Sequence, residues 1–63
     1  MVNDACMRTC LIRKSVDHAW IEVIVGCATS APNVTLFAQL LNLKHVPVRW
    51  HDEAVACYNE CNR

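Results

Sequence analysis

Five cysteines are the residues of this chain that are best suited to chemistry. Four of them form two Cys-x-x-x-Cys pairs near the two ends of the chain, Cys6 with Cys10 and Cys57 with Cys61. Residues four positions apart project from the same face of a helix. If the first and last helices pack antiparallel, Cys6 faces Cys61 and Cys10 faces Cys57. Two disulfides would then join the ends of the chain.

The same four sulfurs have two other interpretations. Tetrahedral sulfur coordination suits zinc or Cu(I), and His51 is a candidate to replace one sulfur. Zinc sites favour the shorter Cys-x-x-Cys spacing, so the metal interpretation is the weaker of the two chemical ones. The third interpretation is that all four cysteines are reduced and buried as small apolar residues.

The twin spacing resembles the paired Cys-x-x-x-Cys motifs of the α-hairpinins and of the small mitochondrial chaperones. In those helical hairpins the two halves lie close together in the sequence. Here residues 11–56 separate them. The resemblance therefore extends to the motif and not to membership of either family.

Cys27 is the unpaired cysteine and a candidate reactive thiol. It follows Gly26 in a segment of small residues, where ligand-binding loops often lie in α/β folds. Cysteine becomes a nucleophile when a base such as histidine lies beside it. No base is close in the sequence, but His18, His45 and His51 are candidates to approach Cys27 in space. An intermolecular disulfide is another option. The simplest interpretation is a small residue in a tight loop.

Size and charge narrow the functional classes. The chain has 63 residues, which indicates one domain (1–63) that needs a staple or a partner for stability. Six basic and six acidic residues cancel, so no basic field favours DNA. No apolar run is long enough to span a membrane. Without a secretory signal we expect a cytoplasmic protein, or a secreted or oxidising location if the cysteines are paired.

Three segments are typical of helices. Residues 3–14 follow a capping Asn3 or Asp4, residues 34–43 follow a capping Ser30 or Asn33, and residues 52–62 begin with acids. Residues 15–26 fit a second helix capped by Ser15, or a strand at 20–25 that ends at Gly26. Residues 26–33 are expected to form a loop, and the chain is expected to contain no internal repeat.

These elements predict a mainly α protein, a three- to four-helix bundle in which the N- and C-terminal helices pack together. The alternative is a small α/β unit with parallel strands near 20–25 and 46–50. A two-stranded parallel sheet is weak in isolation, which favours the helical architecture.

Residues 34–51 resemble the apolar skeleton of prokaryotic helix-turn-helix regulators. That resemblance implies a DNA-binding regulator. The segment departs from the pattern at Asn42, where a turn glycine is usual, and at Pro47, where the recognition helix should continue. A basic stripe is also missing.

No set of residues suggests catalysis, and we expect a protein that is not an enzyme. The chain is 54% apolar, which leaves apolar surface for association. We therefore expect a small interaction or regulatory module that binds a protein partner or itself as a homodimer. Its candidate interface residues are Trp20, Phe37, Leu40 and Trp50. The alternatives are the DNA-binding regulator and a cysteine-based metal or redox protein with zinc or copper; otherwise no cofactor is expected.

Overall fold

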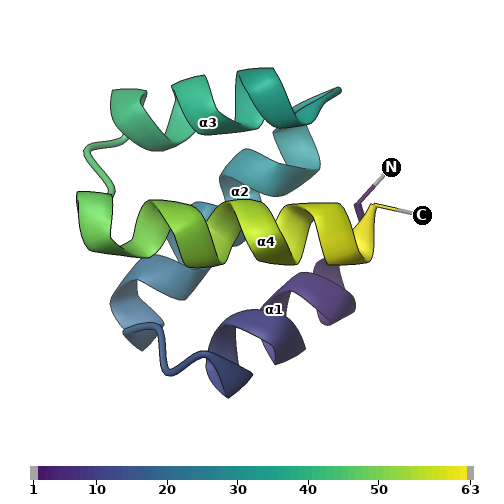
Figure 1. Ribbon diagram of the computed structural model, residues 1–63, viewed down its shortest axis with the longest axis vertical. Helices are drawn as coiled ribbons and strands as arrows, with labels where there is room; N and C mark the ends of the chain where they lie inside the picture. Colours follow the sequence, from purple (N-terminus) through teal and green to yellow (C-terminus); the bar gives the residue numbers. More distant parts are fainter. Residues whose placement is uncertain (1, 63) are drawn as a thin grey trace.

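A computed structural model describes residues 2–62 of the chain, and four α-helices account for most of them (Figure 1). The helices are α1 (Asp4–Arg13), α2 (His18–Ser30), α3 (Val34–Leu43) and α4 (His51–Cys61), with a short 3-10 turn, η1 (Val48–Trp50), leading into α4. The predicted helical bundle is confirmed. No helix within residues 2–62 has the length and apolar character needed to cross a membrane.

Side-chain caps start three of the helices. The Asn3 Oδ1 atom accepts a hydrogen bond from the Cys6 N–H group, and the Asn33 Oδ1 atom accepts one from the Leu36 N–H group, each at 2.9 Å. Both asparagines were predicted caps. A cap of this kind satisfies an N–H group that lacks a partner in the first turn of a helix.

The alternative with strands at 20–25 and 46–50 is wrong. Residues 20–25 lie within α2, and residues 46–50 form a turn and η1. The β-branched residues of α2 recur at helical spacing, so Ile21, Ile24 and Val25 all face the core. Burial of this stripe outweighs the β propensity of the residues, which is a weak preference.

The loop expected at 26–33 is also shorter than predicted. The helix α2 continues through Gly26 to Ser30, and only residues 31–33 connect it to α3. A glycine within a helix costs about 1 kcal/mol relative to alanine and does not by itself end the helix.

Two turns of the same type end α1 and α3. Ser15 and His45 adopt left-handed backbone angles, with φ of 62° and 61°. The following residues, Val16 and Val46, are buried, and their N–H groups donate to Leu11 O and Leu41 O. This is the Schellman arrangement, which satisfies the last carbonyls of a helix. Ser15 is therefore a turn residue and not the predicted cap of α2.

Asp17 is the residue that caps α2, through a 2.8 Å hydrogen bond from the Ala19 N–H group. At the corresponding place before α4 the chain has Pro47, which cannot donate a backbone hydrogen bond and is followed by the 3-10 turn η1.

The matching turns belong to an internal repeat. Position n of the first helical hairpin corresponds to position n + 30 of the second, as in Asn3 and Asn33. The expectation of a chain without repeats is therefore wrong. Many corresponding residues share their structural environment, as in the pairs Asn3/Asn33, Met7/Phe37, Leu11/Leu41, Lys14/Lys44, Val16/Val46, Trp20/Trp50, Ile24/Ala54, Cys27/Cys57 and Ala28/Tyr58.

The helix contacts follow the repeat. The helix α1 packs on α2 and α4, and α3 packs on α4 and α2. Exchanging α1 with α3 and α2 with α4 leaves this set of contacts unchanged, which is the pattern of a quasi-twofold arrangement. Figure 1 shows α1 and α3 on opposite sides of α4, which passes in front of α2. Two equivalent interhelical seams result, α1–α4 and α2–α3.

Aromatic packing fills the core between α3 and α4. The rings of Phe37 and Tyr58 stack with centroids 4.7 Å apart, and both side chains are almost fully buried. The Tyr58 hydroxyl donates to Ala31 O at 3.1 Å, just beyond the end of α2. The equivalent residues in the first hairpin are the smaller Met7 and Ala28, so the two hairpins fill this part of the core unequally.

Candidate functional site

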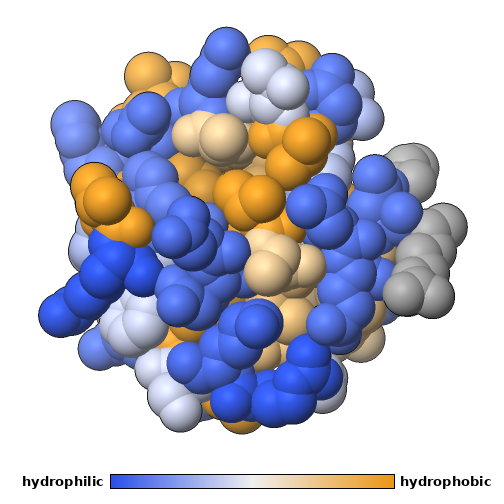
Figure 2. All heavy atoms as spheres, viewed as in Figure 1, coloured by the Kyte–Doolittle hydropathy of each residue, from blue (hydrophilic) through white to orange (hydrophobic). Residues whose placement is uncertain are grey.

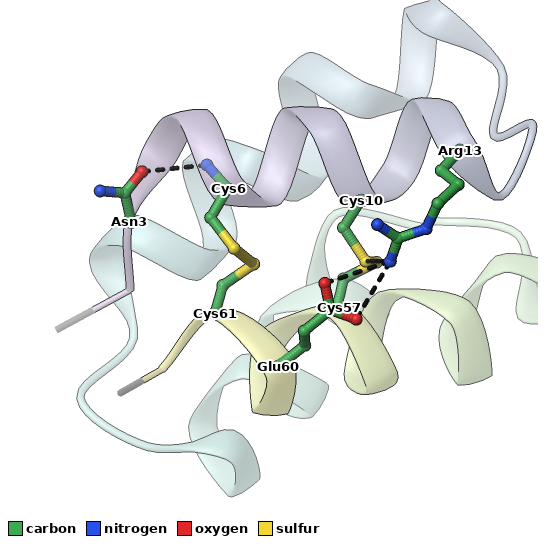
Figure 3. The surroundings of a disulfide bond; sticks show 7 residues. All are labelled: Asn3, Cys6, Cys10, Arg13, Cys57, Glu60 and Cys61. Atoms are coloured by element: carbon green, nitrogen blue, oxygen red, sulfur yellow. Dashed lines mark hydrogen bonds and ion pairs between the residues drawn. A yellow bond between two sulfur atoms is a disulfide. The ribbon is translucent and has the colours of Figure 1, made fainter.

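The α1–α4 seam carries both disulfides (Figure 3). Cys6 is bonded to Cys61 and Cys10 to Cys57, with Cα atoms 5.7 Å apart in each pair. This is the antiparallel pairing derived from the Cys-x-x-x-Cys spacing. The two bonds lie one helical turn apart and hold α1 against α4 near both chain ends.

Arg13 covers the second disulfide. Its Nη2 atom lies 3.0 and 3.1 Å from the two carboxylate oxygens of Glu60 and 3.5 Å from Cys10 Sγ. In Figure 3 the guanidinium group of α1 reaches across the seam to α4. The seam is therefore closed by two covalent bonds and an ion pair.

A disulfide sulfur has no thiolate charge to offer a metal ion. The donor atoms of Cys6, Cys61 and Glu60 lie within 4.8 Å of one another, but the two sulfurs are bonded to each other. The candidate ligand His51 is engaged elsewhere, because its Nε2 atom is 2.7 Å from Val46 O. In the disulfide form, the predicted metal ligands are not assembled as a metal site.

The α2–α3 seam is the equivalent of the stapled seam, but it contains no disulfide. The repeat places Cys27 at the position of Cys57 and Leu40 at the position of Cys10. Both residues line a groove of about 360 Å³ between α2 and α3. Cys27 is thus a cysteine whose partner position holds a leucine.

The Cys27 thiol is 4% exposed and is free. Burial raises the pKa of the Cys27 thiol, and the positive charge of Lys44 offsets part of that rise. A thiol with a raised pKa has little thiolate at neutral pH and is a poor nucleophile. No histidine is among the residues that line the groove. The structure does not assemble a Cys–His pair around this candidate reactive thiol.

The four predicted interface residues differ in exposure. Phe37 is fully buried, so it is a core residue and cannot contact a partner. Trp20, Leu40 and Trp50 are half-buried and pack against the core. Arg49 lies over the ring of Trp50, with its guanidinium carbon 5.0 Å from the centroid.

The most exposed large apolar residues were not predicted. Leu43 is 71% exposed and Val48 is 80% exposed, on the two sides of the α3–α4 turn. The equivalent residues of the α1–α2 turn are Arg13 and His18. The same backbone turn therefore accommodates polar residues at these positions, and the fold does not require Leu43 and Val48. Only the repeat reveals this difference.

Hydrophobic surface is also present away from the turn. Figure 2 shows hydrophobic residues gathered along the line where α3 and α4 meet, bordered by hydrophilic residues on both sides. Leu36 on α3 is 40% exposed. On the other turn Ile12 is 54% exposed, so apolar exposure is not confined to the second hairpin.

Segment 34–51, the predicted helix-turn-helix, comprises α3, the turn and the start of α4. The helix that follows the turn is α4, whose exposed residues include Asp52, Asn59 and Glu60. Acidic side chains on that face would repel phosphate groups.

Comparison with protein-family models, with curated proteins and with solved structures finds no significant match to this chain.

Proposed function

We propose that this chain is a small, non-enzymatic binding module that recognises another protein, in the first place a second copy of itself. The observation that carries the proposal is the difference between the two turns. Leu43 and Val48 expose their side chains at positions where the first hairpin has Arg13 and His18. Exposed apolar residues that the fold does not need are typical of association surfaces.

The disulfides suit this function. A chain of this size has a small core, and cross-links make up for it by restricting the unfolded state. A rigid scaffold loses little conformational entropy on binding, which improves affinity. Because disulfides persist in oxidising environments, we place the protein in a secreted or otherwise oxidising location.

The test uses size-exclusion chromatography with light scattering at protein concentrations up to about 1 mM, which detects weak dimers. The variant Leu43→Arg/Val48→His introduces the residues of the first hairpin and should keep the fold. We expect a wild-type dimer and a monomeric variant. The matched control is Ile12→Asn, which introduces the residue of the second hairpin at the other turn and should remain dimeric.

A wild-type chain that is monomeric throughout this range contradicts self-association. A dimer that survives Leu43→Arg/Val48→His but is lost in Ile12→Asn would move the interface to the first turn. Circular dichroism of each variant verifies that the helices are retained.

A further inference from the structure

The α2–α3 seam differs from its stapled counterpart in having open space. Its groove has a volume of about 360 Å³, within the range of small-molecule sites. It is lined by Val23, Gly26, Cys27 and Ser30 of α2 and by Leu40 and Lys44 of α3. At the equivalent place in the α1–α4 seam, the disulfides and the Arg13–Glu60 pair occupy the interface.

Gly26 lines the groove and adds no side chain to it. A Cβ atom built on Gly26 meets no heavy atom within 4 Å. The equivalent residue of α4 is Ala56. A glycine in a helix costs stability relative to alanine, and here alanine would fit. The absence of a side chain therefore serves no packing need of the fold and leaves space beside Val23 and Leu40.

The two charged residues that line the groove, Glu22 and Lys44, differ in whether they form an ion pair. Glu22 lines the groove, but its carboxylate is held by Arg8 of α1, which also pairs with Asp4. The hydrogen bond from Arg8 lowers the pKa of Glu22, so this carboxylate stays ionised and paired. None of the ion pairs found within residues 2–62 involves Lys44. Within this part of the chain, the groove thus combines apolar walls with a positive charge that forms no ion pair.

We propose that the α2–α3 groove binds a small amphipathic carboxylate, such as a medium-chain alkanoate. Its apolar chain lies along Val23, Gly26 and Leu40, and its carboxylate lies beside the Lys44 ammonium group. Cys27 forms part of the groove wall and is covered when the ligand is bound. This site goes beyond the proposed self-association, because Leu43 and Val48 do not line the groove.

The test is a titration of the intact disulfide-bonded protein with sodium octanoate, followed by amide chemical shifts in NMR. We expect saturable shifts confined to the groove residues of α2 and α3. Octanol, which lacks the charge, and octyltrimethylammonium, which carries the opposite charge, should bind more weakly, for octanol by up to about 5-fold, the upper end of what one exposed charge pair contributes.

Three variants locate the ligand. Gly26→Leu fills the groove and should abolish the shifts, while Gly26→Ala adds only a Cβ atom and should retain binding. Lys44→Gln should weaken octanoate binding by up to about 5-fold and leave octanol binding unchanged. Octanoate should also slow the alkylation of Cys27 in the wild type.

Several results would overturn the proposal. They are the absence of saturable shifts, shifts of equal size in Gly26→Leu, or tighter binding of octyltrimethylammonium than of octanoate. Because the Leu43→Arg/Val48→His variant retains the groove, its octanoate binding shows whether the groove and the self-association surface are independent.

Discussion

At the scale of single residues, Ser15 and His45 have backbone angles that are more usual for glycine than for their own residue types. Both adopt left-handed angles that favour glycine, and neither is glycine or asparagine. The sequence therefore lacks the glycine or asparagine that usually marks the left-handed residue of such a turn. The caps Asn3 and Asn33 were predictable, because asparagine before an apolar helical stripe is a strong start signal.

Replacing either turn residue by glycine should stabilise the protein. The left-handed conformation costs a non-glycine residue about 1–2 kcal/mol, and glycine loses part of this gain through its greater freedom in the unfolded chain. We expect Ser15→Gly and His45→Gly each to raise the free energy of unfolding by about 0.5–1 kcal/mol. Chemical denaturation measures this change in the free energy of unfolding.

The neighbouring residues Lys14 and Lys44 provide the control, because their φ angles are −87° and −88°. Lys14→Gly and Lys44→Gly should not stabilise the protein. Equal gains at the turn residues and at these controls would contradict the backbone explanation.

At the scale of helices, α2 is the element that the sequence described least well. Its β-branched run and Gly26 both suggest a strand followed by a loop, yet the segment is helical from His18 to Ser30. Tertiary burial decides this, and a short apolar run carries no information about what packs against it. The helices α1, α3 and α4 were predictable to within one residue or so at each end, because their caps and apolar spacing agree.

Of the two seams, only the one between α1 and α4 was predictable from the sequence. The Cys-x-x-x-Cys spacing predicted the pairing of Cys6 with Cys61 and of Cys10 with Cys57 only on the condition that the first and last helices pack antiparallel. The role of Cys27 and the groove beside it could be recognised only through the repeat. Few positions of the repeat carry identical residues in both halves, and these positions are scattered. Large differences such as Ala28 against Tyr58 hide it in the sequence.

The equivalence of the two seams predicts a third disulfide. Leu40 stands at the position of Cys10 and Cys27 at that of Cys57, so Leu40→Cys should pair with Cys27. The new bond closes a short loop, for which the chain-entropy model gives about 3 kcal/mol of added stability. Thiol titration of the denatured, unreduced variant should find no free thiol.

Leu36→Cys is the matched control. Its equivalent is Cys6, whose partner position in this seam holds Ala31. This variant should retain two free thiols. Two free thiols in Leu40→Cys as well would show that the seams are not equivalent.

At the scale of the whole molecule, the two disulfides are nested. Cys10–Cys57 lies inside the loop closed by Cys6–Cys61. Once one bond is formed, the other closes only a short loop, which consists of residues 6–10, residues 57–61 and the first bond. Their contributions to stability therefore differ according to whether the other bond is present.

Removing one disulfide should cost about 2.5 kcal/mol, as for a short loop, rather than the 4 kcal/mol of a long one. We expect Cys10→Ala/Cys57→Ala to remain folded with a lowered midpoint in guanidinium. Replacing all four cysteines should cost about 6–7 kcal/mol in the same model, comparable to the whole stability of a small domain.

The quadruple variant should therefore be largely unfolded by circular dichroism, whereas the single Cys27→Ala variant should stay folded. A quadruple variant as stable as the single-disulfide variants would show that the helices hold together without the staples.

The central claim is that two disulfides close one seam of a doubled helical hairpin and leave Cys27 free in the other. The most direct measurement is peptide mapping by mass spectrometry without reduction, after alkylation of the denatured protein. Trypsin cuts after Arg8, between Cys6 and Cys10, and chymotrypsin cuts after Tyr58, between Cys57 and Cys61. We predict that the Cys6 peptide is linked to the Cys61 peptide, the Cys10 peptide to the Cys57 peptide, and that Cys27 alone is alkylated. Links of Cys6 to Cys57 and Cys10 to Cys61, any bridge that includes Cys27, or alkylation of all five cysteines would contradict the account.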